Sequence, residues 1–185
     1  MKTIKLLAVL FISTLVFAAC SDDHDDDHDH GSDEELITTV IYTLTDGTNP
    51  DVVLTWEDTD GDTGNDPTFT VSGGPLTAKT TYTGTIQLLN ETELPAEDIT
   101  VEVRAEGDEH EFFYIPNSVN LNVTKEDEDS NGNSLGIETT VTTFAASTGT
   151  LTVILKHEPT KPNDDKVAVA GGSTDIEVTF DITVQ

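Results

Sequence analysis

The chain of 185 residues contains a single cysteine, Cys20, and this scarcity excludes a fold held together by internal disulfide bonds. Basic residues are also few, because 8 Lys and Arg stand against 36 Asp and Glu, for a formal net charge of -28 at pH 7. Nucleic-acid binding requires basic side chains that neutralise phosphates, so the charge balance argues against a nucleic-acid partner. Cations and basic partners are the natural ligands of such a chain.

A long hydrophobic segment is missing too. The one apolar run, residues 6–17, is shorter than the roughly 20 residues with which a helix crosses a bilayer. Two lysines precede this run, and two alanines and Cys20 follow it, a layout typical of a secretory signal peptide. Its end resembles the lipobox of bacterial lipoproteins. The resemblance implies a signal peptide over residues 1–19, diacylation and N-acylation of Cys20, and anchoring to the membrane through these acyl chains.

The segment after the cysteine has no apolar residue, and residues 21–35 carry nine carboxylates and three histidines. Such a composition cannot form a core, so residues 20–35 are predicted to be a disordered tether. Its first residues, Ser-Asp-Asp, resemble the acidic tag that sends some Gram-negative lipoproteins to the cell surface. This implies an outer-membrane lipoprotein that faces outward, with the periplasmic face as the alternative. The tether offers loose zinc or copper ligands, against the simpler interpretation of a solvated spacer, and these are His24, His28 and His30.

From residue 36 onward, apolar and polar residues alternate, as is typical of half-buried β-strands. In the last segment, Val178 and Phe180 are predicted to face the core, and Asp175 to face outward. Glycine-containing turns such as Asn131-Gly132 separate the segments. The pattern predicts an all-β domain over residues 36–185, an antiparallel β-sandwich of about eight to ten strands. The clearest predicted strands are at 36–45, 51–57, 81–89, 118–124, 148–157 and 175–185.

The sequence of residues 95–105 is compatible with one short helix as well as with a strand. Ile99 and Val103 are four residues apart, and Glu97 and Asp98 suit the positive end of a helix. The same stretch, ITVEV, also alternates like a strand.

Phrases spread over the chain, among them TYTGTIQLLNETELPAEDIT, TGTLTVILKHEPTKPND and GGSTDIEVTFDITVQ, resemble a group of short acidic bacterial lipoproteins. Members are often named type 1 periplasmic binding fold superfamily proteins. The resemblance covers nearly the whole chain and implies no activity and no binding residues. The name refers to a larger α/β protein with two doubly wound domains, whereas the alternation and the length of this chain predict the β-sandwich.

Two acidic loops match patterns of calcium sites. The stretch DEDSNGNSLGIE, residues 127–138, fits the loop of helix-loop-helix calcium proteins, although strands are predicted on both sides of it. The stretch EDTDGDTGND, residues 57–66, resembles the ion loops of secreted adhesion modules. The alternative for both loops is an ordinary acidic turn. The candidate calcium ligands are Asp58, Asp60, Asp62 and Asp66 in one loop and Asp127, Asp129 and Asn131 in the other.

The predicted body contains two histidines, His110 at the start of a strand and His157 at the end of another. Together with Glu111 they are a weaker candidate for a zinc or copper site, and the alternative is that they are ordinary strand-terminal residues. The chain has no nucleophile elbow, and its abundant carboxylates single out no catalytic pair, so we expect no enzymatic activity.

The sequence therefore predicts a non-catalytic binding module on a surface lipoprotein, which captures a ligand or a divalent cation. Calcium is the first candidate cofactor, with zinc or copper second. The expected partners are the membrane, through Cys20, and an outer-membrane transporter or an extracellular ligand. The alternative is a structural or adhesive module of the cell envelope whose loops are stiffened by ions.

Overall fold

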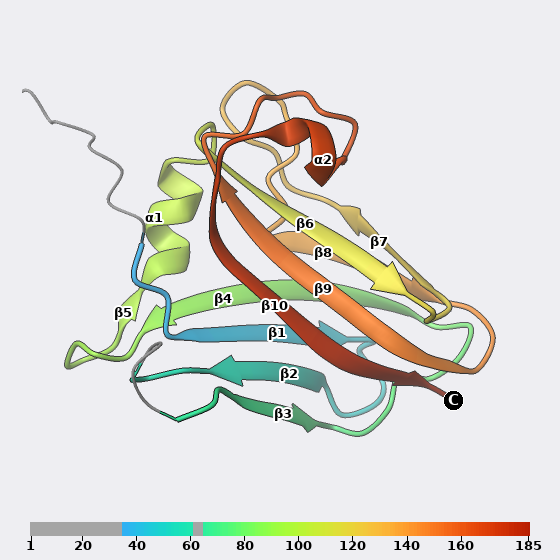
Figure 1. Ribbon diagram of the computed structural model, residues 1–185. Coiled ribbons are helices and arrows are strands. Elements are labelled where there is room, and N and C mark those ends of the chain that lie inside the picture. Colours follow the sequence, from blue (N-terminus) through green and yellow to red (C-terminus); the bar gives the residue numbers. More distant parts are fainter. Residues whose placement is uncertain (1–34, 61–64) are drawn as a thin grey trace, which may run out of the picture. The chain divides into compact units, whose positions relative to one another are not determined.

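The computed structural model describes residues 35–60 and 65–185, in which two antiparallel sheets face each other (Figure 1). The larger sheet contains β1 (Thr39–Thr45), β2 (Val52–Glu57), β3 (Thr68–Ser72), β4 (Thr81–Asn90), β5 (Glu97–Asp98), β7 (Leu121–Lys125) and β8 (Glu138–Thr143). The smaller sheet contains β6 (His110–Asn117), β9 (Ser147–His157) and β10 (Ser173–Val184). Two short helices are α1 (Ile99–Ala105) and α2 (Val167–Ala170).

The strand order in the larger sheet is β3-β2-β1-β4-β8-β7, with β5 beside β4, and the order in the smaller sheet is β10-β9-β6. The arrangement confirms the predicted antiparallel β-sandwich. The smaller sheet is three strands wide, and it joins strands that are far apart in the sequence. β6 pairs with β9, although β7 and β8 of the other sheet lie between them in the sequence.

The core lies between the sheets, and strand alternation places it there. In β4 the side chains of Tyr82, Ile86 and Leu88 are buried while their neighbours Thr83 and Thr85 are exposed. The same alternation runs through the second half of β10. Burial of each large apolar side chain contributes about 1.5–3 kcal/mol.

The segment for which the sequence allowed either a helix or a strand forms the helix α1. Asp98 caps it by accepting a hydrogen bond from the backbone N–H of Thr100 at 3.1 Å. Ile99 and Val103 are buried, whereas Val101 between them is 67% exposed, so the helical spacing and not the alternation decides which residues reach the core.

The predicted signal peptide, Cys20 and the tether histidines lie outside the described residues. Among the residues that are described, no helix is long and apolar enough to cross a membrane.

Candidate metal centre

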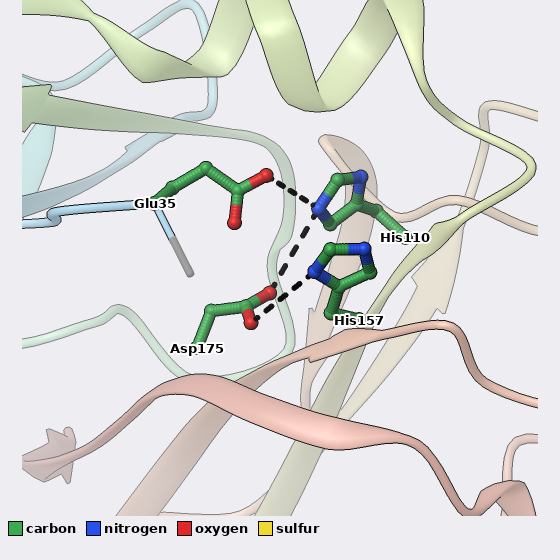
Figure 2. Close-up of side chains that lie close together, drawn as sticks. All are labelled: Glu35, His110, His157 and Asp175. Atoms are coloured by element: carbon green, nitrogen blue, oxygen red, sulfur yellow. Dashed lines mark ion pairs between the residues drawn. The ribbon is translucent and has the colours of Figure 1, made fainter. Parts of the chain in front are cut away.

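Four side chains converge at one end of the smaller sheet: Glu35, His110, His157 and Asp175 (Figure 2). Their nearest nitrogen and oxygen atoms all lie within 4.8 Å of one another. The four residues come from the segment before β1 and from β6, β9 and β10. Two imidazoles and two carboxylates at these distances form a group that could hold a metal ion.

The register of the smaller sheet brings the two histidines together. His110 is the first residue of β6 and His157 the last residue of β9, and they are directly paired in the antiparallel ladder. Paired residues point to the same face of a sheet. Their ring centroids are accordingly 4.8 Å apart, with an interplanar angle of 33°.

A β-bulge turns Asp175 into the site. In β10, Thr174 pairs with Lys156 and Ile176 pairs with Leu155, so the ladder shifts at the residue between them. An extra residue in one strand changes the face to which its side chain points. The prediction that Asp175 faces outward is therefore wrong: its side chain is 0% exposed and one carboxylate oxygen lies 3.9 Å from Nε2 of His110.

Glu35 reaches the site from the segment that the sequence assigns to the tether. Its Oε1 lies 2.8 Å from Nε2 of His110, and its side chain is 7% exposed. Its second oxygen, Oε2, is buried and accepts no hydrogen bond within the described part of the chain. A buried carboxylate oxygen without a partner is destabilising, and a bound cation would relieve this cost.

The hydrogen bonds of His110 suit a metal ligand. Its Nδ1 lies 3.2 Å from the backbone carbonyl oxygen of Glu106, which favours a proton on Nδ1 and directs Nε2 toward the carboxylates. Metal-binding histidines are commonly oriented in this way by a carbonyl oxygen.

The ionisation of the group follows from its geometry. Burial by itself would lower the pKa of His110, but the hydrogen bond to Glu35 and the negative charges of Glu35 and Asp175 outweigh it and raise the pKa above its ordinary value. Burial would raise the pKa of Glu35, but the hydrogen bond with His110 leaves this pKa below its ordinary value. Both shifts favour the charged forms, so Glu35 and His110 stabilise each other as an ion pair whenever His110 is protonated.

Glu111, the third member of the zinc or copper site considered from the sequence, lies elsewhere. Successive residues of a strand point to opposite faces, so Glu111 points away from its neighbour His110. Its carboxylate accepts hydrogen bonds from Nζ of Lys125 at 2.6 Å and from the side-chain amide of Asn163 at 2.6 Å. The structure thus joins the two predicted histidines but replaces Glu111 with Glu35 and Asp175.

The acidic loop 127–138 joins β7 to β8, and its carboxylates are engaged by the loop itself. Asp127 accepts hydrogen bonds from the backbone N–H groups of Gly136 at 2.8 Å and Ile137 at 3.1 Å. Asp129 accepts from the backbone N–H groups of Asn131 at 2.8 Å and Asn133 at 2.9 Å. The flanking elements are strands, as expected, and calcium binding by this loop stays a prediction.

The other acidic loop is described only in part, because Asp62 lies outside the described residues. Asp60 accepts hydrogen bonds from the backbone N–H of Asn65 and from its side-chain amide, the latter at 2.9 Å. Within the described ranges, Asp58, Asp60 and Asp66 do not join a cluster of three or more histidine or acidic ligands. Calcium binding here also stays a prediction.

Comparisons with protein-family models, with curated proteins and with solved structures found no match to this chain. A functional inference for it therefore rests on its own residues.

Proposed function

We propose that this chain is a lipid-anchored, non-catalytic binding module of the bacterial outer membrane that holds a divalent transition-metal ion. The ion would be bound by Glu35, His110, His157 and Asp175, and zinc is the favoured ion. The observation that carries the proposal is the convergence of these four side chains, with all ligand atoms within 4.8 Å of one another.

The chemistry of the ligands favours zinc over calcium. Calcium prefers six to eight oxygen ligands, whereas imidazole nitrogens mixed with carboxylates suit zinc and copper. Zinc bonds of about 2.0–2.2 Å in a tetrahedron place ligand atoms roughly 3.4 Å apart. The present separations of up to 4.8 Å are somewhat wider, so the four side chains would close slightly around the ion.

The number of ligands supports a holding role instead of catalysis. A catalytic zinc site usually has three protein ligands and keeps its fourth position for water or substrate. Here four protein side chains are available, and those of His110 and Asp175 are 0% exposed. A complete ligand set, of which His157 is the most exposed member at 15%, leaves little access for a substrate.

The same geometry supports the structural alternative. An ion on these ligands would tie the segment before β1 to one end of β6, β9 and β10, and so would stiffen the domain. The rate of zinc transfer to a chelator discriminates between the two roles. A capture module should release zinc while folded, and a purely structural site should release it only at the rate of unfolding.

Thermal unfolding of the metal-free full-length chain tests the metal centre. Zinc at a hundredfold excess over its dissociation constant should stabilise the protein by about 2.7 kcal/mol, and this shift should be greatly reduced in His157→Gln. The matched control replaces the tether histidines His24, His28 and His30 with Gln, and it should retain the full shift.

Two results would contradict the proposed site. The first is a melting temperature of the wild-type protein that does not change with zinc, and the second is a control that loses the shift while His157→Gln retains it. The second result would place the ion on the tether.

A further inference from the structure

The two sheets differ in width, and this leaves part of the larger sheet half covered. Phe69 and Val71 in β3 pair with Trp56 and Leu54 in β2, so they belong to the face that forms the core. Trp56 and Leu54 are 9% and 1% exposed, whereas Phe69 and Val71 are 51% and 50% exposed. Coverage by the smaller sheet therefore ends between β2 and β3.

The half-covered residues adjoin an edge strand of the smaller sheet. β10 is the first strand in the order β10-β9-β6, so one of its sides faces away from β9 (Figure 1). The ring of Phe180 in β10 meets the ring of Phe69 edge to face, with centroids 6.2 Å apart. A further strand placed beside β10 would thus lie over the apolar residues of β3.

The outer edge of β10 has backbone groups available for such a strand. The backbone N–H of Leu76 donates to the carbonyl oxygen of Thr183, and the N–H of Gln185 donates to the carbonyl oxygen of Leu76, both at 2.9 Å. These contacts show that the backbone N–H and C=O groups of the odd-numbered residues in this part of β10 point away from β9. The backbone groups of successive residues point alternately to the two sides of a strand. In the described part of the chain, this edge is paired only at its end, by residues 76–78.

The acidic side chains along this edge indicate which kind of strand would bind there. The side chains of Glu177 and Asp181 are exposed on the outer face of β10. A second copy that paired through β10 would bring these carboxylates together, which is unfavourable. The tether of this chain has no apolar residue that could cover Phe69 and carries nine carboxylates of its own.

We propose that the open edge of β10 over residues 177–181 binds an extended segment of a partner protein in which apolar and basic residues alternate. The backbone of the segment would continue the smaller sheet beyond β10. Its apolar side chains would cover Phe69 and Val71, and its basic side chains would lie beside Glu177 and Asp181. This surface is separate from the metal centre, and its proposed role does not depend on a bound ion.

Peptide binding to the full-length chain tests this surface. The probe is a labelled synthetic peptide of about nine residues that alternates Val and Lys, a typical strand length. Fluorescence anisotropy should show saturable binding. A peptide with Glu in place of Lys should bind at least about tenfold more weakly, because like charges oppose each other across neighbouring strands. A Val-Lys peptide methylated at alternate backbone nitrogens, in the register that faces β10, should not bind, because it cannot donate the ladder hydrogen bonds.

A charge reversal in the protein sharpens the test. The double variant Glu177→Lys, Asp181→Lys should weaken binding of the Val-Lys peptide about tenfold and strengthen binding of the Val-Glu peptide. The matched control is Glu93→Lys, Asp108→Lys, which makes the same change in net charge at exposed positions outside β10 and β3. The control should alter the dissociation constant by less than about threefold, since distant surface charges are screened by salt. Hydrogen exchange at the amide of Thr179 should slow when the peptide binds.

Three outcomes would overturn the proposal. Equal loss of affinity in the control would show that only the overall charge attracts the peptide. Equal binding of the methylated peptide would exclude addition of a strand. A dimer of the full-length chain in which the amide of Thr179 is already protected would show that a second copy occupies the edge.

Discussion

Asp129 matches a ligand position of the calcium-loop pattern, but its carboxylate accepts hydrogen bonds from the backbone of its own loop. Two backbone N–H groups reach one of its oxygens, and Nζ of Lys161 lies 3.1 Å from the other. Burial opposes its ionisation, but the hydrogen bonds from Asn133, Asn131 and Lys161 outweigh it and lower the pKa of Asp129 to about 2. The charged form of this residue is therefore part of what holds the turn.

We expect Asp129→Asn to destabilise the protein by about 1–3 kcal/mol at neutral pH, because the amide cannot accept the same set of hydrogen bonds. The pKa of Asp129 is lower in the folded state than its ordinary value of 3.8, so its contribution is complete above that value and is lost as the pH falls toward about 2. Urea unfolding over this range should show the variant and the wild type converge as the pH falls.

The exposed residue Asp181 offers a matched control, and Asp181→Asn should change the free energy of unfolding by less than about 0.5 kcal/mol at neutral pH. A gap between Asp129→Asn and the wild type that stayed constant down to pH 2 would show that the charge of Asp129 is not the source of the effect.

At the scale of the element, the bulge in β10 decides whether the metal centre has its fourth ligand. Nζ of Lys156 donates to the hydroxyl of Thr174 at 2.9 Å, which places Thr174 on the outer face. With regular alternation after Thr174, the side chain of Asp175 would point inward, but those of Ile176 and the following even-numbered residues would point outward. The inserted residue lets both Asp175 and the apolar series from Val178 onward face the interior.

We predict that deletion of Thr174 removes the stabilisation by zinc. Without the extra residue, Asp175 would pair with Lys156 and take the outward direction of Thr174. Circular dichroism should still show a folded β protein, and the melting temperature should no longer respond to zinc. The substitution Thr174→Val keeps the number of residues and should retain the zinc shift. A deletion variant that responded to zinc as the wild type does would remove Asp175 from the proposed ligand set.

At the scale of the whole molecule, the proposed lipid anchor at Cys20 should be separable from the folded body. We predict that Cys20→Ser is not labelled by an alkyne fatty acid in cells and no longer fractionates with membranes, because Cys20 is the only cysteine and the expected acylation site. The body should keep its melting temperature, since the substitution lies outside the residues that form the core. Equal labelling of variant and wild type would remove the lipoprotein proposal.

The body's strands were largely predictable from the sequence, because the alternation of apolar and polar residues is a local property of each strand. The apolar spacing of Ile99 and Val103 likewise allowed the helix to be considered. The short strand β3 was not predicted, and its exposed pattern explains why: the inner residues Phe69 and Val71 are only half covered. A strand that buries few side chains on either face shows only a weak alternation of apolar and polar residues in the sequence.

The sequence by itself determined the β class of the body, the extreme acidity of the chain and the ends of the strands that carry His110 and His157. Only the tertiary structure decided that these two ends lie side by side, since the register between β6 and β9 depends on pairing between distant segments. It also decided the place of Asp175, through a bulge, and of Glu35, through the path of the chain before β1. Hydrophobic periodicity reports the face on which a residue lies, and a metal centre depends in addition on which segments meet at that face.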